Sequence, residues 1–162
     1  MTNKEKLVRI LIDKKLQIAT MESCTGGALA NRITQVEGSS EILKFSAITY
    51  SNEYKIKMGV SKEIIDTYSV YSKEVAKEMS RNIAIFANSD IGVGITGKIN
   101  RFDPNNPYGK DNLIYYHVYF ANQNKDYSGT IQAVDGNRQM NQNRIVDIII
   151  DHILDIISSS HI

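Results

Sequence analysis

The apolar residues of the chain recur with the period of a helix in some segments and gather as short β-rich runs in others. Between residues 4 and 16 they fall at near-helical spacing, which predicts an amphipathic helix. The short apolar run at residues 17–21 is typical of a strand. The pattern therefore predicts that the chain opens with a helix followed by a strand.

The same patterns predict the remaining elements. Further helices are predicted at residues 25–36, 53–58, 61–67, 72–87 and 139–157. Further strands are predicted at residues 43–51, 91–96, 113–121 and 127–134. Helices alternate with strands early in the chain, and two strands are neighbours late in the chain. This order favours an α/β fold, a single-domain α/β/α sandwich with a mixed sheet.

Length and composition agree with one domain. The chain has 162 residues, and its 42% hydrophobic content is enough for one sizeable core. We therefore expect a single domain over residues 1–162. Charged residues interrupt the apolar pattern at the N-terminus, so the uninterrupted apolar region of a secretory signal is missing, and we expect a cytoplasmic protein.

Charge and cysteine content narrow the possible partners. The net charge is +1 and there is no dense block of lysine or arginine, which argues against binding to nucleic acid or to an anionic membrane. The single cysteine, Cys24, excludes an internal disulfide framework and a cysteine-based zinc site. We expect a small molecule or another protein as the partner, and no metal.

The segment TMESCTGG, residues 20–27, lies where a predicted strand meets a predicted helix. Free backbone N–H groups and the helix dipole favour negative charge at such a junction, so it could stabilise an anion or an oxyanion. Gly26 and Gly27 would let a ligand approach the backbone closely. The alternative is that Ser23 or Thr25 only caps the helix, and local chemistry alone favours that interpretation.

A serine nucleophile needs a base, and the three histidines are poorly placed for this role. His117 falls inside a predicted strand, His152 inside the last helix and His161 at the end of the chain. A lysine that has lost its proton in a desolvated site can activate a hydroxyl instead.

The segment TYSNEYK, residues 49–55, offers the best lysine. It leaves a predicted strand and enters a helix, so Tyr50 and Asn52 would share one strand face, with Lys55 one turn further on. In the alternative interpretation Lys55 is solvated, Tyr50 is a core aromatic residue and Asn52 is a helix cap.

Four segments together carry a family resemblance. They are ESCTGG at 22–27, GSSEILKFSAITYSNEYKIKMGV at 38–60, YSKEVAKEM at 71–79 and DIGVGITG at 90–97. In this order they resemble the CinA C-terminal family, the PncC-type nicotinamide mononucleotide deamidases, in its stand-alone form. The resemblance implies hydrolysis of the carboxamide of nicotinamide mononucleotide to nicotinate mononucleotide and ammonia, without a cofactor. The partner would be a pyridine ribonucleotide, and we expect a homodimer or higher homo-oligomer.

The resemblance also implies catalytic roles. Ser23 resembles the nucleophile of the family, Lys55 its base and Tyr50 an active-site hydroxyl. Backbone N–H groups of residues 25–27 would stabilise the oxyanion. Cys24 competes with Ser23 as a nucleophile, but as its strand neighbour it should point to the opposite side, and we expect it to pack in the core.

Further positions would bind the substrate. Asn52 belongs to the YSNE motif, and Thr96 and Gly97 match the Thr-Gly of the family. Arg138, within VDGNRQMNQNR at 134–144, aligns with an arginine of the family, and its planar guanidinium suits a phosphate group. The alternative for Arg138 is a solvated residue at a helix end.

Two positions depart from the family pattern. GKINRFDPNNPYGKDN, residues 97–112, replaces the usual Ile-Ala-Gly-Pro continuation and brings in Lys98, Arg101, Phe102 and Asp103. The second arginine of the family falls on Gln142, and Arg144 lies on a different helix face. A pocket altered in these two places could accept another pyridine ribonucleotide, or could bind its ligand without turnover. The alternative function is therefore a non-catalytic CinA-like module that binds a nucleotide or a protein.

Overall fold

A five-stranded sheet lies at the centre of the protein. The computed structural model describes residues 1–100, 110–160 and 162. The strands are β1 (Ile18–Glu22), β2 (Ser46–Ile48), β3 (Ile91–Gly97), β4 (Leu113–Phe120) and β5 (Lys125–Gln132). Their order in the sheet is β2-β1-β3-β4-β5. β1 pairs in parallel with β2 and β3, whereas β4 is antiparallel to β3 and β5. The sheet is therefore mixed, as predicted.

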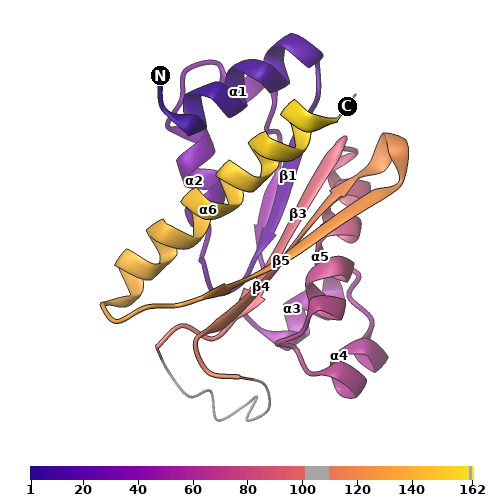
Figure 1. The fold of residues 1–162 in the computed structure, drawn as a ribbon. Coiled ribbons are helices and arrows are strands. Elements are labelled where there is room, and N and C mark those ends of the chain that lie inside the picture. The colour runs from indigo at the N-terminus through magenta and orange to yellow at the C-terminus, as the bar shows by residue number, and fades with distance from the viewer. Residues whose placement is uncertain (101–109, 161) are drawn as a thin grey trace.

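Helices cover both faces of the sheet (Figure 1). One layer contains α1 (Asn3–Lys14), α2 (Ala28–Thr34) and α6 (Arg138–Ser159). The other contains α3 (Asn52–Lys57), α4 (Lys62–Tyr68) and α5 (Lys73–Ala87). Two short 3-10 helices, η1 (Ser39–Glu41) and η2 (Ala121–Gln123), lie in connections. This arrangement is the α/β/α sandwich that the sequence predicted.

Each face of the sheet has its own hydrophobic core, and successive residues of β1 alternate between the two. Ala19 and Met21 pack with buried residues of α4 and α5. Ile18 packs with buried residues of α1, α2 and α6. If the alternation continues past the end of the strand, Ser23 falls on the α3–α5 side and Cys24 on the α6 side.

Two predicted elements are shorter than expected. The helix predicted at 25–36 begins only at Ala28, because Gly26 and Gly27 have φ angles of +60° and +96° that do not fit a helix. The strand predicted at 43–51 covers only Ser46–Ile48. The chain leaves the sheet early because Ser51 caps α3 by accepting a hydrogen bond from the N–H of Tyr54.

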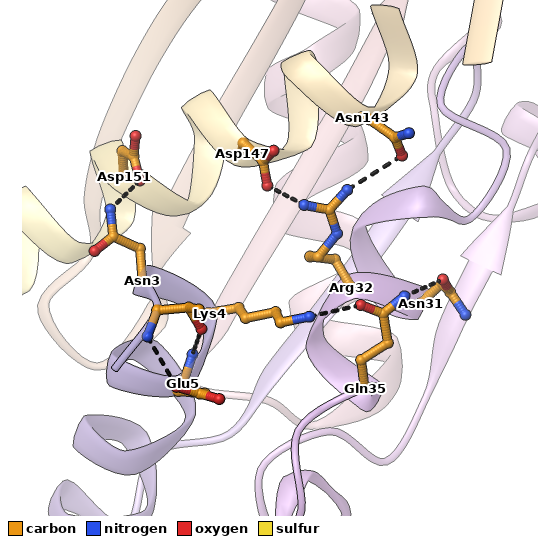
Figure 2. Close-up of polar contacts among 10 residues, drawn as sticks. Asn3, Lys4, Glu5, Asn31, Arg32, Gln35, Asn143, Asp147 and Asp151 are labelled. Carbon is orange, nitrogen blue, oxygen red and sulfur yellow. Dashed lines mark hydrogen bonds and ion pairs between the residues drawn. The ribbon is translucent and has the colours of Figure 1, made fainter. Parts of the chain in front are cut away.

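Polar side chains connect the helices of one layer (Figure 2). Arg32 on α2 donates to the Asn143 amide oxygen at 3.1 Å and forms an ion pair with Asp147, both on α6. Asn3 on α1 donates to the carboxylate of Asp151, also on α6, at 2.6 Å. These contacts hold α6 against α1 and against α2, which begins just after the ESCTGG segment.

None of the helices among the described residues could cross a membrane. Even α6, with 22 residues, carries amide and charged side chains along its length. Most of its isoleucines are buried in the core on this face of the sheet.

Candidate active site

Ser23 and Lys55 meet at the carboxyl end of β1. The Nζ atom of Lys55 lies 2.9 Å from the Oγ atom of Ser23, although the two residues are 32 positions apart. Nζ also donates to the backbone carbonyl of Thr49 at 2.6 Å. Ser23 is 7% exposed and Lys55 only 2%. The interpretation of Lys55 as a solvated residue is therefore wrong, and the two side chains form a nearly enclosed polar pair.

α3 places Lys55 on the buried side of a short helix. The hydroxyl of Ser51 begins the helix, and the N–H of Lys55 donates to the carbonyl of Ser51 at 3.1 Å. The neighbours Tyr54 and Ile56 are 54% and 38% exposed, so the helix turns only Lys55 inward. Lys55 is thus the residue of α3 whose side chain is buried, with its amine against the Ser23 hydroxyl.

The ESCTGG segment forms a tight turn after β1. The N–H of Ser23 donates to the carbonyl of Ile95 at 3.1 Å, which joins the start of the turn to β3. The N–H of Gly26 donates to the carbonyl of Ser23 at 2.9 Å. A Cβ atom on Gly27 would lie only 2.9 Å from Cδ1 of Ile48. Both glycines have positive φ angles, so the backbone of the turn favours glycine at both positions, and a side chain at Gly27 would also require Ile48 to shift.

The carboxylate of Glu22, a residue that the sequence patterns did not single out, lies at the N-terminus of α2. Oε1 accepts from the hydroxyl of Thr25 at 2.7 Å and from the N–H of Leu29 at 3.0 Å. Oε2 accepts from the N–H of Ala30 and the hydroxyl of Thr20, both at 2.9 Å. The helix N-terminus is therefore not open to a ligand. The only sequence signal was an acidic residue just before a predicted helix start.

We expect Glu22→Gln to destabilise the protein, because an amide cannot accept from all four donors in a buried site. The free energy of unfolding should fall by about 2–4 kcal/mol, measured by urea denaturation. The matched control is Glu53→Gln, since Glu53 is exposed and forms an exposed ion pair with Lys57 one helical turn away. That change should cost no more than about 0.5 kcal/mol. Equal effects of the two substitutions would show that the Glu22 carboxylate does not hold the turn.

Two residues near the start of α6 reach the same region. Arg138 donates from Nη2 to the hydroxyl of Tyr50 at 3.1 Å and from Nη1 to the carbonyl of Ile99. Gln142, one helical turn further on, donates from Nε2 to the carbonyl of Cys24 at 2.9 Å. Tyr50 is 63% exposed, so its interpretation as a core aromatic residue is wrong. Arg138 and Tyr50 thus lie together at the surface beside the Ser23 turn.

The family model of the CinA C-terminal domain matches residues 1–157. The chain belongs to the CinA C-terminal domain family. Among its relatives are competence-damage inducible proteins of Caldanaerobacter subterraneus subsp. tengcongensis, 39% identical over 137 residues, and of Clostridium acetobutylicum, 40% identical over 147 residues. The matches cover 83% and 89% of this chain but 32% and 34% of those proteins. The chain therefore spans about a third of the length of these relatives.

Crystal structures of CinA superfamily proteins share the fold. The protein from Escherichia coli matches with a TM-score of 0.83 and 23% identity, over 94% of this chain and 87% of that one. A protein from Klebsiella pneumoniae 700603 matches with a TM-score of 0.85 and 21% identity, over 98% and 97% of the two chains. At this level of identity the likeness shows the α/β fold.

Three further positions carried over from the CinA pattern lie close to the carboxyl ends of the central strands or on α3. Thr96 is fully buried, and its hydroxyl donates to the carbonyl of Val70 at 2.9 Å. Gly97 lets β4 come close, because a Cβ atom there would lie 2.7 Å from Cα of Ile114. Asn52 is the first residue of α3. The structure thus gives Thr96 and Gly97 structural contacts, and their roles in substrate binding stay predictions.

The departures from the CinA pattern fall on both sides of the site. Lys98 is buried, with Nζ 3.6 Å from a carboxylate oxygen of Asp111 and 5.0 Å from the centroid of the Tyr71 ring. Arg101, Phe102 and Asp103 lie outside the described residues. Arg144 donates to the carbonyl of Gln132 at 2.8 Å, so its guanidinium is directed to the end of β5 and does not replace the missing arginine.

Cys24 points into the core on the side opposite Lys55, as predicted. Its side chain is 4% exposed and packs in the hydrophobic cluster of α1, α2 and α6. Burial raises the pKa of the Cys24 thiol to about 12. The thiolate is the nucleophilic form of cysteine, so Cys24 is unreactive near neutral pH.

The two histidines that the structure describes have partners elsewhere. Nε2 of His117 lies 2.7 Å from the carboxylate of Asp126, and burial lowers the pKa of His117. The ring of His152 bonds the hydroxyl of Tyr116 at 2.6 Å. Neither supplies a base for Ser23. In the described part of the chain, no three His, Cys, Asp or Glu side chains come together in a way that could hold a metal ion.

Proposed function

We propose that this CinA-family chain is an amidase that converts nicotinamide mononucleotide to nicotinate mononucleotide and ammonia. The observation that carries the proposal is the 2.9 Å contact between Nζ of Lys55 and Oγ of Ser23 in a nearly enclosed site. The choice of substrate rests on the resemblance of the ESCTGG and YSNEYK segments to the deamidases of the family.

The proposed chemistry begins with a neutral Lys55. The hydroxyl of Ser23 gives its proton to Nζ while Oγ attacks the carboxamide carbon of the substrate. Lys55 then passes the proton to the leaving nitrogen, the C–N bond breaks and ammonia departs. Water attacks the resulting ester, which releases the carboxylate product and restores the Ser23 hydroxyl. The carbonyl of Thr49 accepts one N–H of Lys55 and so turns Nζ toward Ser23.

Backbone N–H groups of the ESCTGG turn are the proposed donors to the tetrahedral oxyanion. The N–H of Gly26 already donates to the carbonyl of Ser23. Among the described residues, no backbone carbonyl accepts from the N–H of Thr25 or Gly27. Thr25, which is closer to Ser23 in the chain, is therefore the leading candidate donor.

Arg138 is the proposed contact for the substrate phosphate. Its guanidinium lies beside the exposed Tyr50 at the N-terminus of α6, where the helix dipole also favours an anion. Arg138 is a cation near the surface, and Ser23 is a nearly buried nucleophile. This arrangement suits a nucleotide that binds with its carboxamide toward Ser23 and its phosphate toward Arg138. Binding of a pyridine ribonucleotide and assembly into a homodimer or higher oligomer stay predictions.

The direct test is ammonia release from nicotinamide mononucleotide by the purified protein. We expect ammonia and nicotinate mononucleotide in equal amounts, and no ammonia above background from the Ser23→Ala protein. Binding of the nucleotide without ammonia release would instead support the non-catalytic alternative. That alternative rested on the altered loop at 98–111, and residues 101–109 lie outside the described residues, so no structural observation favours it.

The rate at limiting substrate should rise with pH if neutral Lys55 is the base. The fraction of neutral amine increases with pH, and the rising limb should end below about 10.4, the ordinary pKa of a lysine side chain. Cys24, with a pKa of about 12, cannot produce this limb. The measurement is kcat/KM between pH 6 and pH 9.5. A flat profile from pH 6 to 9 would argue against a lysine base.

A further inference from the structure

Gln142 lies against the turn that carries Ser23. Its Nε2 donates to the carbonyl of Cys24 at 2.9 Å and lies 3.8 Å from the position of a Cβ atom on Gly26. The neighbouring Asn141 is fully buried and exchanges two hydrogen bonds, both of 2.9 Å, with the backbone of Val134. The ion pair of Arg32 with Asp147 holds the next turn of α6. The Gln142 amide is therefore presented to the turn from a firmly held helix.

The bond to Cys24 also determines where the next N–H group points. A trans peptide is planar, so the carbonyl of Cys24 and the N–H of Thr25 point in opposite directions. The carbonyl faces Gln142 on α6, and the N–H of Thr25 is therefore directed away from α6. The Ser23 side chain also faces away from α6, toward Lys55. The side chain of Thr25 is fixed separately through its bond to Glu22.

We propose that Gln142 is a positioning residue, which holds the Cys24–Thr25 peptide so that the Thr25 N–H faces the oxyanion formed at Ser23. This role rests on the proposed function and adds a residue that does not touch the reacting atoms. Preorganised donors act mainly on the transition state, so the loss of this bond lowers kcat rather than substrate affinity. The donor group of Gln142, rather than its size, is what the turn requires.

The kinetic test compares four variants by ammonia release from nicotinamide mononucleotide. Gln142→Ala lowers kcat by about tenfold to a hundredfold while KM stays within about threefold. The Thr25 N–H is still present in this variant but is poorly directed, so the loss in rate is smaller than if an oxyanion donor were removed altogether. Gln142→Glu, whose carboxylate only accepts, lowers kcat at least as far. Gln142→Arg keeps a donor and restores kcat to within about fivefold of wild type. The control, Arg144→Ala, changes kcat less than about twofold, because the guanidinium of Arg144 donates to the carbonyl of Gln132 at the end of β5.

A second measurement does not depend on the nucleotide. A fluorophosphonate probe forms a bond between its phosphorus and Oγ of Ser23 and loses fluoride, while the Ser23 proton passes to Lys55 and then to solvent. The phosphoryl oxygen of the probe takes the place of the oxyanion. Gln142→Ala slows labelling of Ser23, followed by mass spectrometry, by a factor close to the loss in kcat, and Gln142→Arg recovers it.

The outcomes separate this inference from the proposed function. Labelling and kcat within twofold of wild type in both Gln142→Ala and Gln142→Glu would overturn the role of Gln142 and leave the proposed function standing. A higher KM with unchanged kcat would also overturn it, since Gln142 would then contact the substrate. A wild type that is labelled at Ser23 but releases no ammonia would remove the proposed function, and labelling of the variants alone then decides the role of Gln142.

Discussion

Ser23→Ala and Lys55→Met should each lower the rate of ammonia release from nicotinamide mononucleotide by on the order of 10⁴-fold or more. In the proposed mechanism Ser23 supplies the attacking oxygen, and the amine of Lys55 lies 2.9 Å from it. Methionine fills the buried space of Lys55 without a basic nitrogen, so the fold should be retained. If the two residues act together as nucleophile and base, the double variant should be no slower than either single variant.

Cys24→Ala provides the matched control for the Ser23 and Lys55 variants. Because the Cys24 thiol is buried in the opposite core, its removal should change the rate by less than about threefold, although stability will fall somewhat. Circular dichroism and a thermal unfolding curve would establish that each variant is folded. A double variant far slower than either single variant would contradict the claim that Ser23 and Lys55 act together. An unchanged rate in Ser23→Ala would point to Cys24 or to a directly activated water.

Arg138→Ala should raise KM for nicotinamide mononucleotide by on the order of a hundredfold, because it removes the proposed cation for the phosphate. Arg138→Lys should raise KM by a smaller factor, since lysine keeps the positive charge but not the bidentate geometry of the guanidinium. The value of kcat should change less than KM, provided that the phosphate is held equally in the ground state and the transition state. Steady-state kinetics on the two variants and the wild type give both values.

Nicotinamide riboside, which lacks the phosphate, is the control substrate for Arg138. The wild type should process it poorly, and the penalty of Arg138→Ala should nearly vanish. If Arg138→Ala raises KM for the riboside as much as for the mononucleotide, Arg138 does not bind the phosphate. It would then contact another part of the substrate or only support Tyr50, to which it donates at 3.1 Å. The next candidates for the phosphate would then be Lys98, buried beside Tyr71, and Arg101, which lies outside the described residues.

Hydrophobic periodicity predicted the type and order of the six α-helices and five strands of the described residues. It could not predict the order β2-β1-β3-β4-β5, because strand neighbours depend on contacts between distant segments. The strand at 43–51 was predicted too long because its residues are β-favouring, and the cap formed by Ser51 outweighed that preference. Local propensity thus predicted the elements better than their ends.

The candidate site, like the fold, was predicted from the sequence only in part. Motif resemblance pointed to Ser23 and Lys55, but nothing local required contact between two residues 32 positions apart. Glu22 was missed because its partners are mostly backbone and hydroxyl groups of α2 and the turn, which no motif records. Gln142 was noticed only as a missing arginine, and its bond to Cys24 spans 118 residues. Interactions with backbone groups across the fold leave little trace in a single sequence.

The acyl-enzyme on Ser23 is the species that distinguishes this mechanism most directly. Wild-type protein mixed with nicotinamide mononucleotide, quenched in acid before the first turnover is complete and digested with trypsin, yields residues 16–32 as one peptide with both Ser23 and Cys24. Mass spectrometry should find the nicotinoyl mononucleotide group on Ser23, and the Lys55→Met protein should show none. An adduct on Cys24, or ammonia released while this peptide stays unmodified throughout, would contradict a serine nucleophile activated by Lys55.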